Sequence, residues 1–369
     1  MKQKIFFIFL SLFPTAAYSC RDAHANQALL TEKQVTAPAP CNTYPKLPYK
    51  ELIIKPNSLT DSHSSCIVEL PNGELFTTWY SSGPPGSSGE SAIWGSRRPP
   101  GASEWTPPEI IHDTPGVNDG NAVLYLGEDR KLWLFWSIRE KNKKQSKLRV
   151  KVSEDFGHTW GEARDFGTPR GYMPRTHPKT LHNGWILLPL YVDWSSSSVA
   201  VLSKDGGLSW ERPRFILPFF GTQPTVIQRS DLSLFALMRS SLPQRKSWQA
   251  VSKDFGKSWQ GWGASELKNP SSSLEMVKLH DGAVVLAFNN TQKGRANLSL
   301  ALSHDDGKSW PRIQAIENNP QSAYEYPSII QDRCGLIHVT YTYDNRKSIA
   351  HYVTDEKIIE SQPEQKVNP

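Results

Sequence analysis

Cysteine is scarce in this chain, with four residues in 369. No Cys-x-x-Cys pair and no cysteine–histidine cluster with zinc spacing occurs, so we expect neither a metal site nor a cofactor. If Cys20 is removed with an N-terminal leader, Cys41, Cys66 and Cys334 remain. Three cysteines in an oxidising compartment allow one disulfide, and the sequence does not show which two residues form it.

Long apolar runs are also scarce. The N-terminus, MKQKIFFIFLSLFPTAAYSC, has two lysines, then an apolar run from Ile5 to about Phe13, then small residues. The run is too short to cross a bilayer as a permanent helix, so no transmembrane segment is expected. The layout is typical of a secretory signal peptide over residues 1–19 and predicts a periplasmic or secreted protein, with lipid anchoring at Cys20 left open.

Charge of one sign is not concentrated anywhere. The 42 basic residues exceed the 36 acidic ones by 6, and the basic residues are scattered. Nothing resembles a nucleic-acid-binding motif, so no nucleic-acid partner is expected. A sequence pI near 9.0 admits an anionic ligand such as an acidic sugar, and equally fits a basic exported protein without one.

Helical periodicity with caps is absent throughout. Instead, a short apolar strand, a turn with Asn, Asp or Gly, and a second strand recur six times, at 66–80, 122–136, 179–191, 225–238, 276–288 and 328–341. Composition and turn residues predict a β-hairpin at each place, and therefore an all-β protein.

One octapeptide occurs four times, as SEDFGHTW (153–160), SKDGGLSW (203–210), SKDFGKSW (252–259) and SHDDGKSW (303–310). Its aspartates, Asp155, Asp205, Asp254 and Asp305, lie 50, 49 and 51 residues apart. A fixed period in this range indicates a repeat architecture. Six hairpins, each with a third strand before the octapeptide and a fourth after it, predict a six-bladed β-propeller with four-stranded antiparallel blades.

These repeats define the expected organisation of the chain. Residues 51–355 form one propeller, because a blade buries its faces only against its neighbours. Residues 20–50 are predicted to be a Pro-rich linker, and residues 356–369 a polar, disordered C-terminal tail.

Within the octapeptide each residue type has a structural use. Asp accepts hydrogen bonds from turn N–H groups, Gly permits a positive φ, and Trp covers the apolar edge of a blade. One catalytic site does not need four copies of its parts. We therefore expect the chemistry from residues that differ between blades.

The octapeptides resemble the Asp-boxes, or BNR repeats, of the sialidase superfamily. Residues 60–352 are similar to the bacterial predicted-neuraminidase group through HSSCIVELPNGELFTTWY, LFALMRSS, NNTQKGRANLSLALSHDDGKSW and YEYPSIIQDRCGLIHVTYTY. The resemblance implies a sialidase-like propeller and an exo-acting glycosidase, although Asp-boxes also occur in propellers of other function.

Sialidases hold the substrate carboxylate with three arginines, because guanidinium and carboxylate pair in a bidentate way. By resemblance, Arg239 in LMRSS and Arg295 in GRANLS match the second and third. At the place of the first arginine this chain has His63, and Arg175 and Arg97 are the candidates to replace it.

Sialidases use a tyrosine nucleophile, since a carboxylate would be repelled by the carboxylate of the sugar. Tyr326 in YEYPSII matches it, with Tyr324 as the alternative. The chain departs from the family where a glutamate assists the tyrosine, because GTQPTV places Thr222 and Gln223 there. Glu325 precedes Tyr326 directly, but adjacent side chains on a strand point to opposite faces.

Other candidates for proton transfer and binding come from separate blades. A second family glutamate, in the last blade, is replaced by Thr342. Glu90, in the loop SSGPPGSSGES, is predicted as the acid/base. His63 and His177 are further candidates because histidine titrates near neutral pH. Asn121 and Gln223 are expected among the substrate-binding residues.

The leading hypothesis is an exported, monomeric glycoside hydrolase of sialidase type that removes a terminal acidic sugar from a glycan, with sialic acid as the first candidate for that sugar. One alternative is a lyase acting at a glucuronate linkage, with His63 or Tyr326 abstracting the proton α to the carboxylate. The other is a glycan-binding propeller without catalysis.

Overall fold

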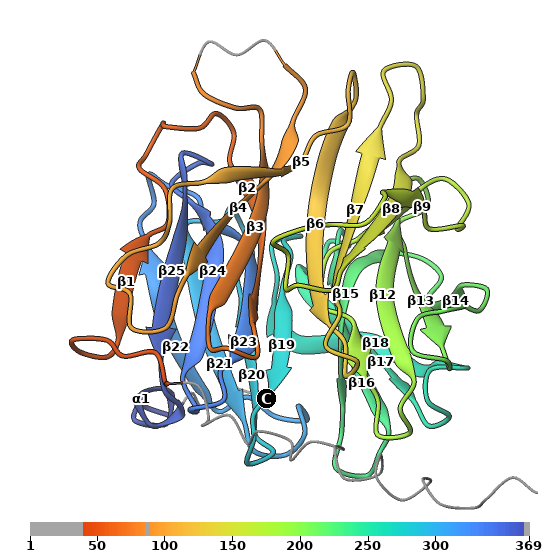
Figure 1. The fold of residues 1–369 in the computed structure, drawn as a ribbon. Helices are drawn as coiled ribbons and strands as arrows, with labels where there is room; N and C mark the ends of the chain where they lie inside the picture. The colour runs from red at the N-terminus through yellow and green to blue at the C-terminus, as the bar shows by residue number, and fades with distance from the viewer. Residues whose placement is uncertain (1–39, 86–88, 365–369) are drawn as a thin grey trace, which may run out of the picture. The chain divides into compact units, whose positions relative to one another are not determined.

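The structure of the protein is a computed structural model that describes residues 40–85 and 89–364. The predicted signal peptide and most of the predicted linker lie outside the described residues. Nearly all regular structure is β (Figure 1), and every strand pair is antiparallel. Six blades of four antiparallel strands form a β-propeller, which confirms the prediction.

The blades follow one another along the chain. The first contains β2 (His63–Glu69), β3 (Leu75–Ser81), β4 (Ala92–Arg98) and β5 (Glu109–His112). The second contains β6 (Asn118–Leu126), β7 (Leu132–Arg139), β8 (Lys147–Ser153) and β9 (Arg164–Asp165). The third contains β10 (Tyr172–Pro174), β11 (Lys179–Thr180), β12 (Ile186–Val192), β13 (Ser197–Ser203) and β14 (Arg214–Leu217). Its inner strand is split into β10 and β11, which both pair with β12.

The second half of the ring contains the fourth, fifth and sixth blades, each with four strands. The fourth blade contains β15 (Gly221–Gln228), β16 (Leu234–Ser240), β17 (Lys246–Ser252) and β18 (Gln260–Lys268). The fifth contains β19 (Glu275–Lys278), β20 (Val284–Phe288), β21 (Asn297–Ser303) and β22 (Arg312–Asn318). The sixth contains β23 (Glu325–Gln331), β24 (Ile337–Tyr343), β25 (Ser348–Thr354) and, from the other end of the chain, β1 (Tyr49–Leu52).

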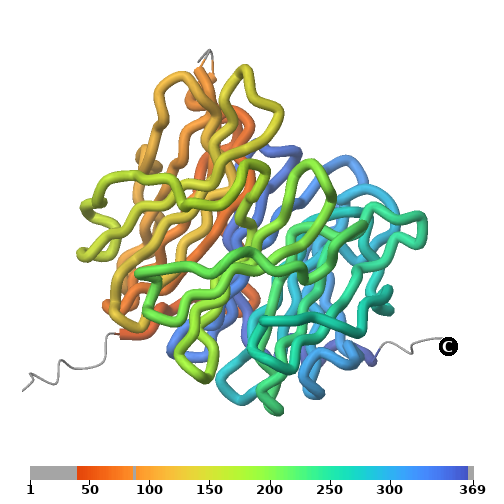
Figure 2. Tube along the Cα trace, turned by 90° about the vertical axis from the view of Figure 1, so that its right-hand side faces the viewer, coloured from red at the N-terminus to blue at the C-terminus, as the bar shows by residue number. Residues whose placement is uncertain are grey.

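Strand β1 closes the ring by pairing with β25 as the outer strand of the sixth blade. Cys41 and Cys334 form a disulfide that ties the segment before β1 to the same blade. The described end of the predicted linker, residues 40–50, therefore belongs to the propeller. Figure 2 shows the first blade in orange beside the last blade in blue, where the ring closes.

The C-terminal end differs from the prediction in a similar way. Helix α1 (Glu356–Glu360) begins where we expected a disordered tail. Asp355 caps it by accepting a hydrogen bond from the Ile358 amide at 2.9 Å, and Ile359 is fully buried. An N-cap and a buried apolar residue are enough to hold one short helix against the blades.

The apolar core lies between the blades. Central strands such as β7, with the sequence LWLFWSIR, are buried on both faces because each blade packs against two neighbours. In the outer strand β18, exposed and buried residues alternate over 264–268, as expected for a strand with one face in water, and the earlier residues of the strand are not buried. No helix among the described residues is long and apolar enough to cross a membrane.

The Asp-boxes occupy the turns that follow the third strands of blades two to five. In the third blade, Asp205 accepts hydrogen bonds from the Ser209 amide at 2.9 Å and from the Ser203 hydroxyl at 2.8 Å. Hydrogen bonds from Ser209 and Ser203 lower the pKa of Asp205 to about 2. The box tryptophan, Trp210, packs against Trp133, Phe135 and Phe166. These turns lie at the edge opposite to the starts of the inner strands.

Candidate active site

Four inner strands share a distortion at the edge where they begin. In blades one, two, four and six the pairing register shifts within the first few residues, at His63/Cys66, Gly120/Val123, Thr222/Thr225 and Glu325/Ser328. Each shift contains a residue with a left-handed backbone: Ser64, Asn121, Gln223 and Tyr326, with φ of 61°, 51°, 55° and 52°. Bulges redirect side chains and are common beside active sites. Three of the four residues are ones that the sequence predicts for the site.

The hydroxyl of Tyr326 lies between two polar side chains of the fourth blade. It accepts hydrogen bonds from Gln223 Nε2 at 3.2 Å and from Arg239 Nη1 at 3.3 Å. Burial raises the pKa of the Tyr326 phenol. The opposing effect of three guanidiniums and the Gln223 amide is larger, so the net pKa lies below the usual 10.0. This phenol is therefore tuned to ionise more easily than a free tyrosine.

Cationic and aromatic groups also surround the Tyr326 ring. The His63 ring centroid is 4.2 Å away, and the guanidiniums of Arg175 and Arg295 lie 4.9 and 5.9 Å from the ring centre. Arg239 and Arg295 are both held by Ser271, whose hydroxyl and carbonyl accept hydrogen bonds from them at 3.3 and 3.2 Å. The two arginines matched by resemblance therefore meet at Tyr326.

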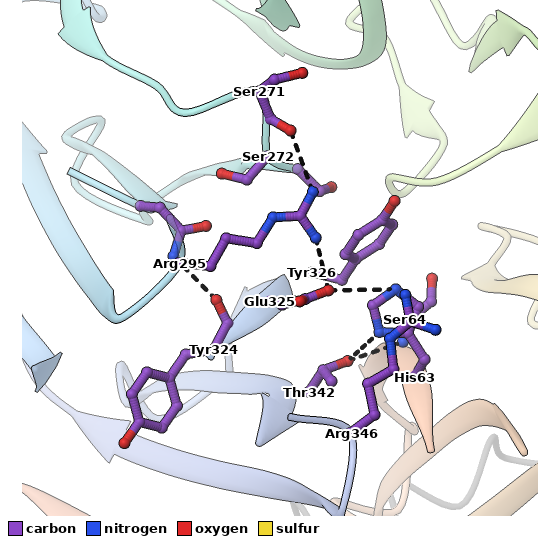
Figure 3. Close-up of polar contacts among 12 residues, drawn as sticks. His63, Ser64, Ser271, Ser272, Arg295, Tyr324, Glu325, Tyr326, Thr342 and Arg346 are labelled. Carbon is purple, nitrogen blue, oxygen red and sulfur yellow. Dashed lines mark hydrogen bonds and ion pairs between the residues drawn. The ribbon is translucent and has the colours of Figure 1, made fainter. Parts of the chain in front are cut away.

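Glu325 occupies a position that the sequence argument did not foresee. Because Tyr326 has a left-handed backbone, the strand alternation that separates adjacent side chains does not hold there. The Glu325 carboxylate accepts a hydrogen bond from Arg295 Nη1 at 2.7 Å and lies 3.7 Å from His63 Nε2 (Figure 3). Glu325 thus orients Arg295, whereas the hydroxyl of Tyr326 is hydrogen-bonded, within the described part of the chain, to Gln223 and Arg239 and not to Glu325.

His63 is buried and held by Thr342. The Thr342 hydroxyl oxygen is 3.0 Å from His63 Nδ1 and accepts a hydrogen bond from the Ser64 amide at 3.0 Å. Burial, followed by the charges of Arg346 and other arginines, lowers the pKa of His63 well below 6.5. His63 is therefore neutral at physiological pH, and Thr342 fixes its ring.

Arg346 is a functional candidate that sequence reasoning missed. It lies in the turn between β24 and β25, where Asp344, Asn345 and Arg346 have three successive left-handed backbones. Such conformations are strained for residues other than glycine and persist where the surrounding structure requires them. Arg346 Nη1 donates to Asp61 at 3.2 Å, and Figure 3 shows the side chain reaching toward His63. The sequence Asp-Asn-Arg does not by itself predict three successive left-handed residues.

Arg175 and Arg97, the two predicted replacements for the first arginine, do not face the open site. Arg175 is fully buried beneath Tyr326 and donates to the Ser273 hydroxyl and to the Ser65 and Pro327 carbonyls at 2.9, 3.3 and 2.8 Å. Arg97 pairs with Glu74 at 2.8 Å and donates to the Phe156 carbonyl in an Asp-box. Arg175 therefore ties its own blade, the third, to the first and sixth blades and to the segment that leads into the fifth, and it places a charge under the tyrosine.

His177 lies deeper still, in a buried cluster on the inner strands. Its Nδ1 is 2.8 Å from Glu275 Oε1, and its Nε2 is 2.8 Å from the Ile67 carbonyl and 3.2 Å from Cys66 Sγ. Both ring nitrogens face acceptors, so the imidazole is doubly protonated. Burial lowers the pKa of His177, but Cys66 and Glu275 outweigh it and raise the pKa to about 10. His177 is a structural cation rather than a group of the open site.

The remaining predicted residues lie toward the first and second blades. Asn121 Nδ2 donates to the Tyr191 hydroxyl at 2.8 Å. Tyr80 and Asn121 reach a cavity of about 250 Å³ beside the Tyr326 cluster. Glu90 pairs with Lys141 at 2.6 Å, which lowers the pKa of its carboxyl and keeps it ionised. In this arrangement Glu90 is not poised as a proton donor.

Within the described residues, no group of three or more His, Cys, Asp or Glu side chains is placed to hold a metal ion. A six-bladed propeller with Asp-boxes, and with a tyrosine ringed by arginines on one face, defines a protein of the sialidase-like superfamily. The chain belongs to the BNR repeat-like domain family, whose model matches residues 73–339. The resemblance predicted from the sequence is thus confirmed.

Similar proteins agree with this family. A sialidase of Bacteroides fragilis is 28% identical over 227 residues, which are 55% of this chain and 41% of that protein's length. A protein of unknown function from Dyadobacter fermentans has a TM-score of 0.70 at 16% identity, covering 84% of this chain and 98% of the other. The intramolecular trans-sialidase of Ruminococcus gnavus also has a TM-score of 0.70, at 13% identity, covering 83% and 97%. At these identities, the two structures show a common fold.

Proposed function

We propose that this protein is a glycoside hydrolase of sialidase type that removes a terminal acidic sugar from a glycan, with sialic acid as the first candidate for that sugar. The observation that carries the proposal is the Tyr326 hydroxyl, which is held by Arg239 and Gln223 and whose pKa is lowered by the surrounding guanidiniums. The Bacteroides fragilis relative supports a glycosidase, and the Asp-box propeller supports the same family of activities.

In this proposal the arginines and the tyrosine divide the work. Arg239, Arg295 and Arg346 bind the carboxylate of the sugar, because guanidiniums stay charged and pair with planar carboxylates. The Tyr326 oxygen attacks the anomeric carbon as the bond to the leaving sugar breaks, and the proton that the phenol loses ends on the leaving oxygen. Water then hydrolyses the bond between the sugar and Tyr326 and restores the phenol. A phenol with a lowered pKa needs less help from a base, which fits the presence of an amide, Gln223, at its hydroxyl.

A second candidate function is favoured by the same amide. Gln223 cannot accept the phenol proton, and among the described residues no carboxylate is hydrogen-bonded to the Tyr326 hydroxyl. A lyase acting at a uronate linkage needs no such carboxylate. There, phenolate Tyr326 or neutral His63 removes the proton α to the substrate carboxylate, while the arginines neutralise the acid, and elimination breaks the glycosidic bond.

A product screen separates these functions. The purified mature protein is incubated with sialosides and with uronate-containing polysaccharides, and the products are identified by mass spectrometry and near-ultraviolet absorbance. Free sialic acid supports the hydrolase, and an unsaturated uronate supports the lyase. Tyr326→Phe abolishes the hydrolase and any lyase that uses Tyr326 as its base, whereas Tyr324→Phe, two residues away in an apolar cluster, retains activity. Glycan binding without product contradicts both and leaves a binding protein.

Export is part of the proposal. The N-terminal pattern that predicts a signal peptide lies outside the described residues, and the disulfide between Cys41 and Cys334 supports an oxidising compartment. Cell fractionation with the full chain tests it, since the proposal requires the protein outside the cytoplasm and shortened at its N-terminus.

A further inference from the structure

Two loops on the face of the candidate site carry three large, mostly exposed aromatic side chains. Trp194 lies between β12 and β13 and is 65% exposed. Phe219 and Phe220 lie between β14 and β15 and are 62% and 53% exposed. We call these three residues the aromatic patch. Exposed aromatic surface of this extent on a folded protein marks a contact surface, because the fold gains nothing from leaving it in water.

The two loops form one surface. The Gly221 amide donates to the Ser196 carbonyl at 3.1 Å, and the Ser197 hydroxyl donates to the Pro218 carbonyl at 2.5 Å. These bonds join the segment that follows Trp194 to the segment that flanks the two phenylalanines. The two loops that carry the patch are therefore hydrogen-bonded to each other.

Trp194 is seated against the backbone despite its exposure. A Cβ atom at Gly171 would lie 2.6 Å from Cδ1 of Trp194, so only a glycine leaves room for the indole there. Gly171 also has a left-handed backbone, with φ of 97°. One side of the indole thus packs against Gly171, and the other side is exposed to water.

The aromatic patch is continuous with the candidate site. Phe220 is three residues before Gln223, which contacts the Tyr326 hydroxyl. On the other side, Asp193 accepts hydrogen bonds from Arg139 Nη2 at 3.3 Å and from the Ser146 amide at 3.1 Å. Arg139 and Ser146 line the cavity of about 250 Å³ that reaches Tyr80 and Asn121. Polar residues that line this cavity, Arg139 and Ser146 among them, therefore extend from Tyr80 and Asn121 to Asp193, the residue before Trp194.

We propose that the aromatic patch binds the neutral sugars that follow the acidic terminal sugar of the glycan, an inference that rests on the proposed function. The guanidiniums of Arg175, Arg239 and Arg295 surround Tyr326. The side chains of the patch are uncharged, and the guanidinium on the cavity wall beside it, that of Arg139, is paired with Asp193. A pyranose ring has an apolar C–H face that packs on an aromatic ring, while its hydroxyls stay in water or bond to neighbouring polar groups such as those of Arg139 and Asp193. The chemistry at the patch thus fits neutral sugar units rather than a second acid.

The test compares Trp194→Ala and the double variant Phe219→Ala/Phe220→Ala with Trp262→Ala. Trp262 is a matched control, since it is 51% exposed on the outer strand β18, away from both loops. Turnover is measured on methyl α-sialoside and on sialyl-lacto-N-tetraose. We expect the patch variants to lower kcat/KM about tenfold on the oligosaccharide and less than twofold on the methyl glycoside, while Trp262→Ala changes neither.

A binding measurement keeps the patch separate from the proposed function. Calorimetry with neutral lacto-N-tetraose should show weak binding that Trp194→Ala removes and Arg239→Ala retains. Binding of this kind without sialoside turnover supports the patch and contradicts the proposed function. An equal loss of kcat/KM on both substrates, or no loss on either, contradicts the patch as a sugar site. A change from dimer to monomer in light scattering also contradicts it, and would show that a second copy of the chain covers the patch.

Discussion

The side-chain amide of Gln223 donates a hydrogen bond to the hydroxyl of Tyr326 at 3.2 Å. Both residues have left-handed backbones within the bulges that open their inner strands, and the two strands belong to different blades. An amide at this place holds the phenol without taking its proton. Ionisation of Tyr326 must then be favoured by the charges around it.

This arrangement predicts a tyrosine that ionises early. The pKa of Tyr326 is lowered from 10.0, so the difference in phenolate absorbance between the wild type and Tyr326→Phe should grow at a pH below 10. Arg239→Ala should move this transition to higher pH, because a cation beside the hydroxyl favours the phenolate. Spectrophotometric titration of the folded protein makes the measurement. Tyr324→Phe, as control, should leave the transition in place; a wild type that shows no early phenolate would contradict the electrostatic argument.

Arg346 should contribute to binding of the substrate acid. We expect Arg346→Ala to lower kcat/KM about 100-fold on an acidic glycoside, since it leaves a substrate carboxylate with one charged partner fewer. On the methyl ester of the same substrate the variant should match the wild type. Arg346→Lys should recover part of the loss because it keeps the charge without the fork geometry.

The control for Arg346 is Arg214→Ala, an exposed arginine of β14 that pairs with Glu211. It should leave both substrates unaffected. An equal loss on the acid and on its ester would show that Arg346 acts on the structure of the turn rather than on the carboxylate.

The buried pair of His177 and Glu275 predicts a pH-dependent stability. The folded-state pKa of His177, about 10, is above its usual 6.5, so its contribution is fully present below pH 6.5 and is lost as pH rises through about 10. His177→Gln should lower the free energy of unfolding by about 3–5 kcal/mol near neutral pH, because it removes the cation that is paired with the buried carboxylate of Glu275 and leaves that charge with amide hydrogen bonds alone. Urea unfolding across this pH window gives both quantities.

The difference between the wild type and His177→Gln should shrink from pH 6.5 to 10. His182→Gln, at an exposed position nearby in sequence, serves as the reference and should show no such trend. A difference that stays constant with pH would mean that His177 is uncharged in the folded protein.

The Asp-boxes should affect stability and not catalysis. Asp254 accepts hydrogen bonds from the Ser258 amide and the Ser252 hydroxyl at 2.9 and 2.8 Å, at the edge opposite to Tyr326. Asp254→Ala should lower the melting temperature by several degrees and leave kcat per folded molecule unchanged. Calorimetry combined with active-site titration measures both, with Glu128→Ala in an exposed hairpin turn as control. Selective loss of kcat in fully folded protein would assign the boxes a part in the reaction.

Much of the fold was predictable because it rests on local patterns that repeat. The period of about 50 residues from Asp155 to Asp305 gave the blade size, and the six hairpins gave the number of blades. The closing strand β1 was not predictable, since it pairs with β25 about 300 residues away and lacks a repeat signature of its own. The same applies to the disulfide, because Cys66 and Cys334 are equally plausible partners for Cys41 until the fold places Cys66 beside His177.

For the site, the sequence by itself determined Tyr326, Arg239 and Arg295, because each stands in a motif that resembles one of the sialidase family. The blade count places the strand ends that carry these motifs on one face. Only the tertiary structure decided how the departures are filled. In the structure, Gln223 is hydrogen-bonded to the hydroxyl of Tyr326, Glu325 to Arg295, and Thr342 to His63. Arg346 is directed toward His63, the residue at the place of the first family arginine. The physical reason is that these contacts join different blades through left-handed bulges and strained turns, whose backbone angles depend on the closed ring and not on the local sequence.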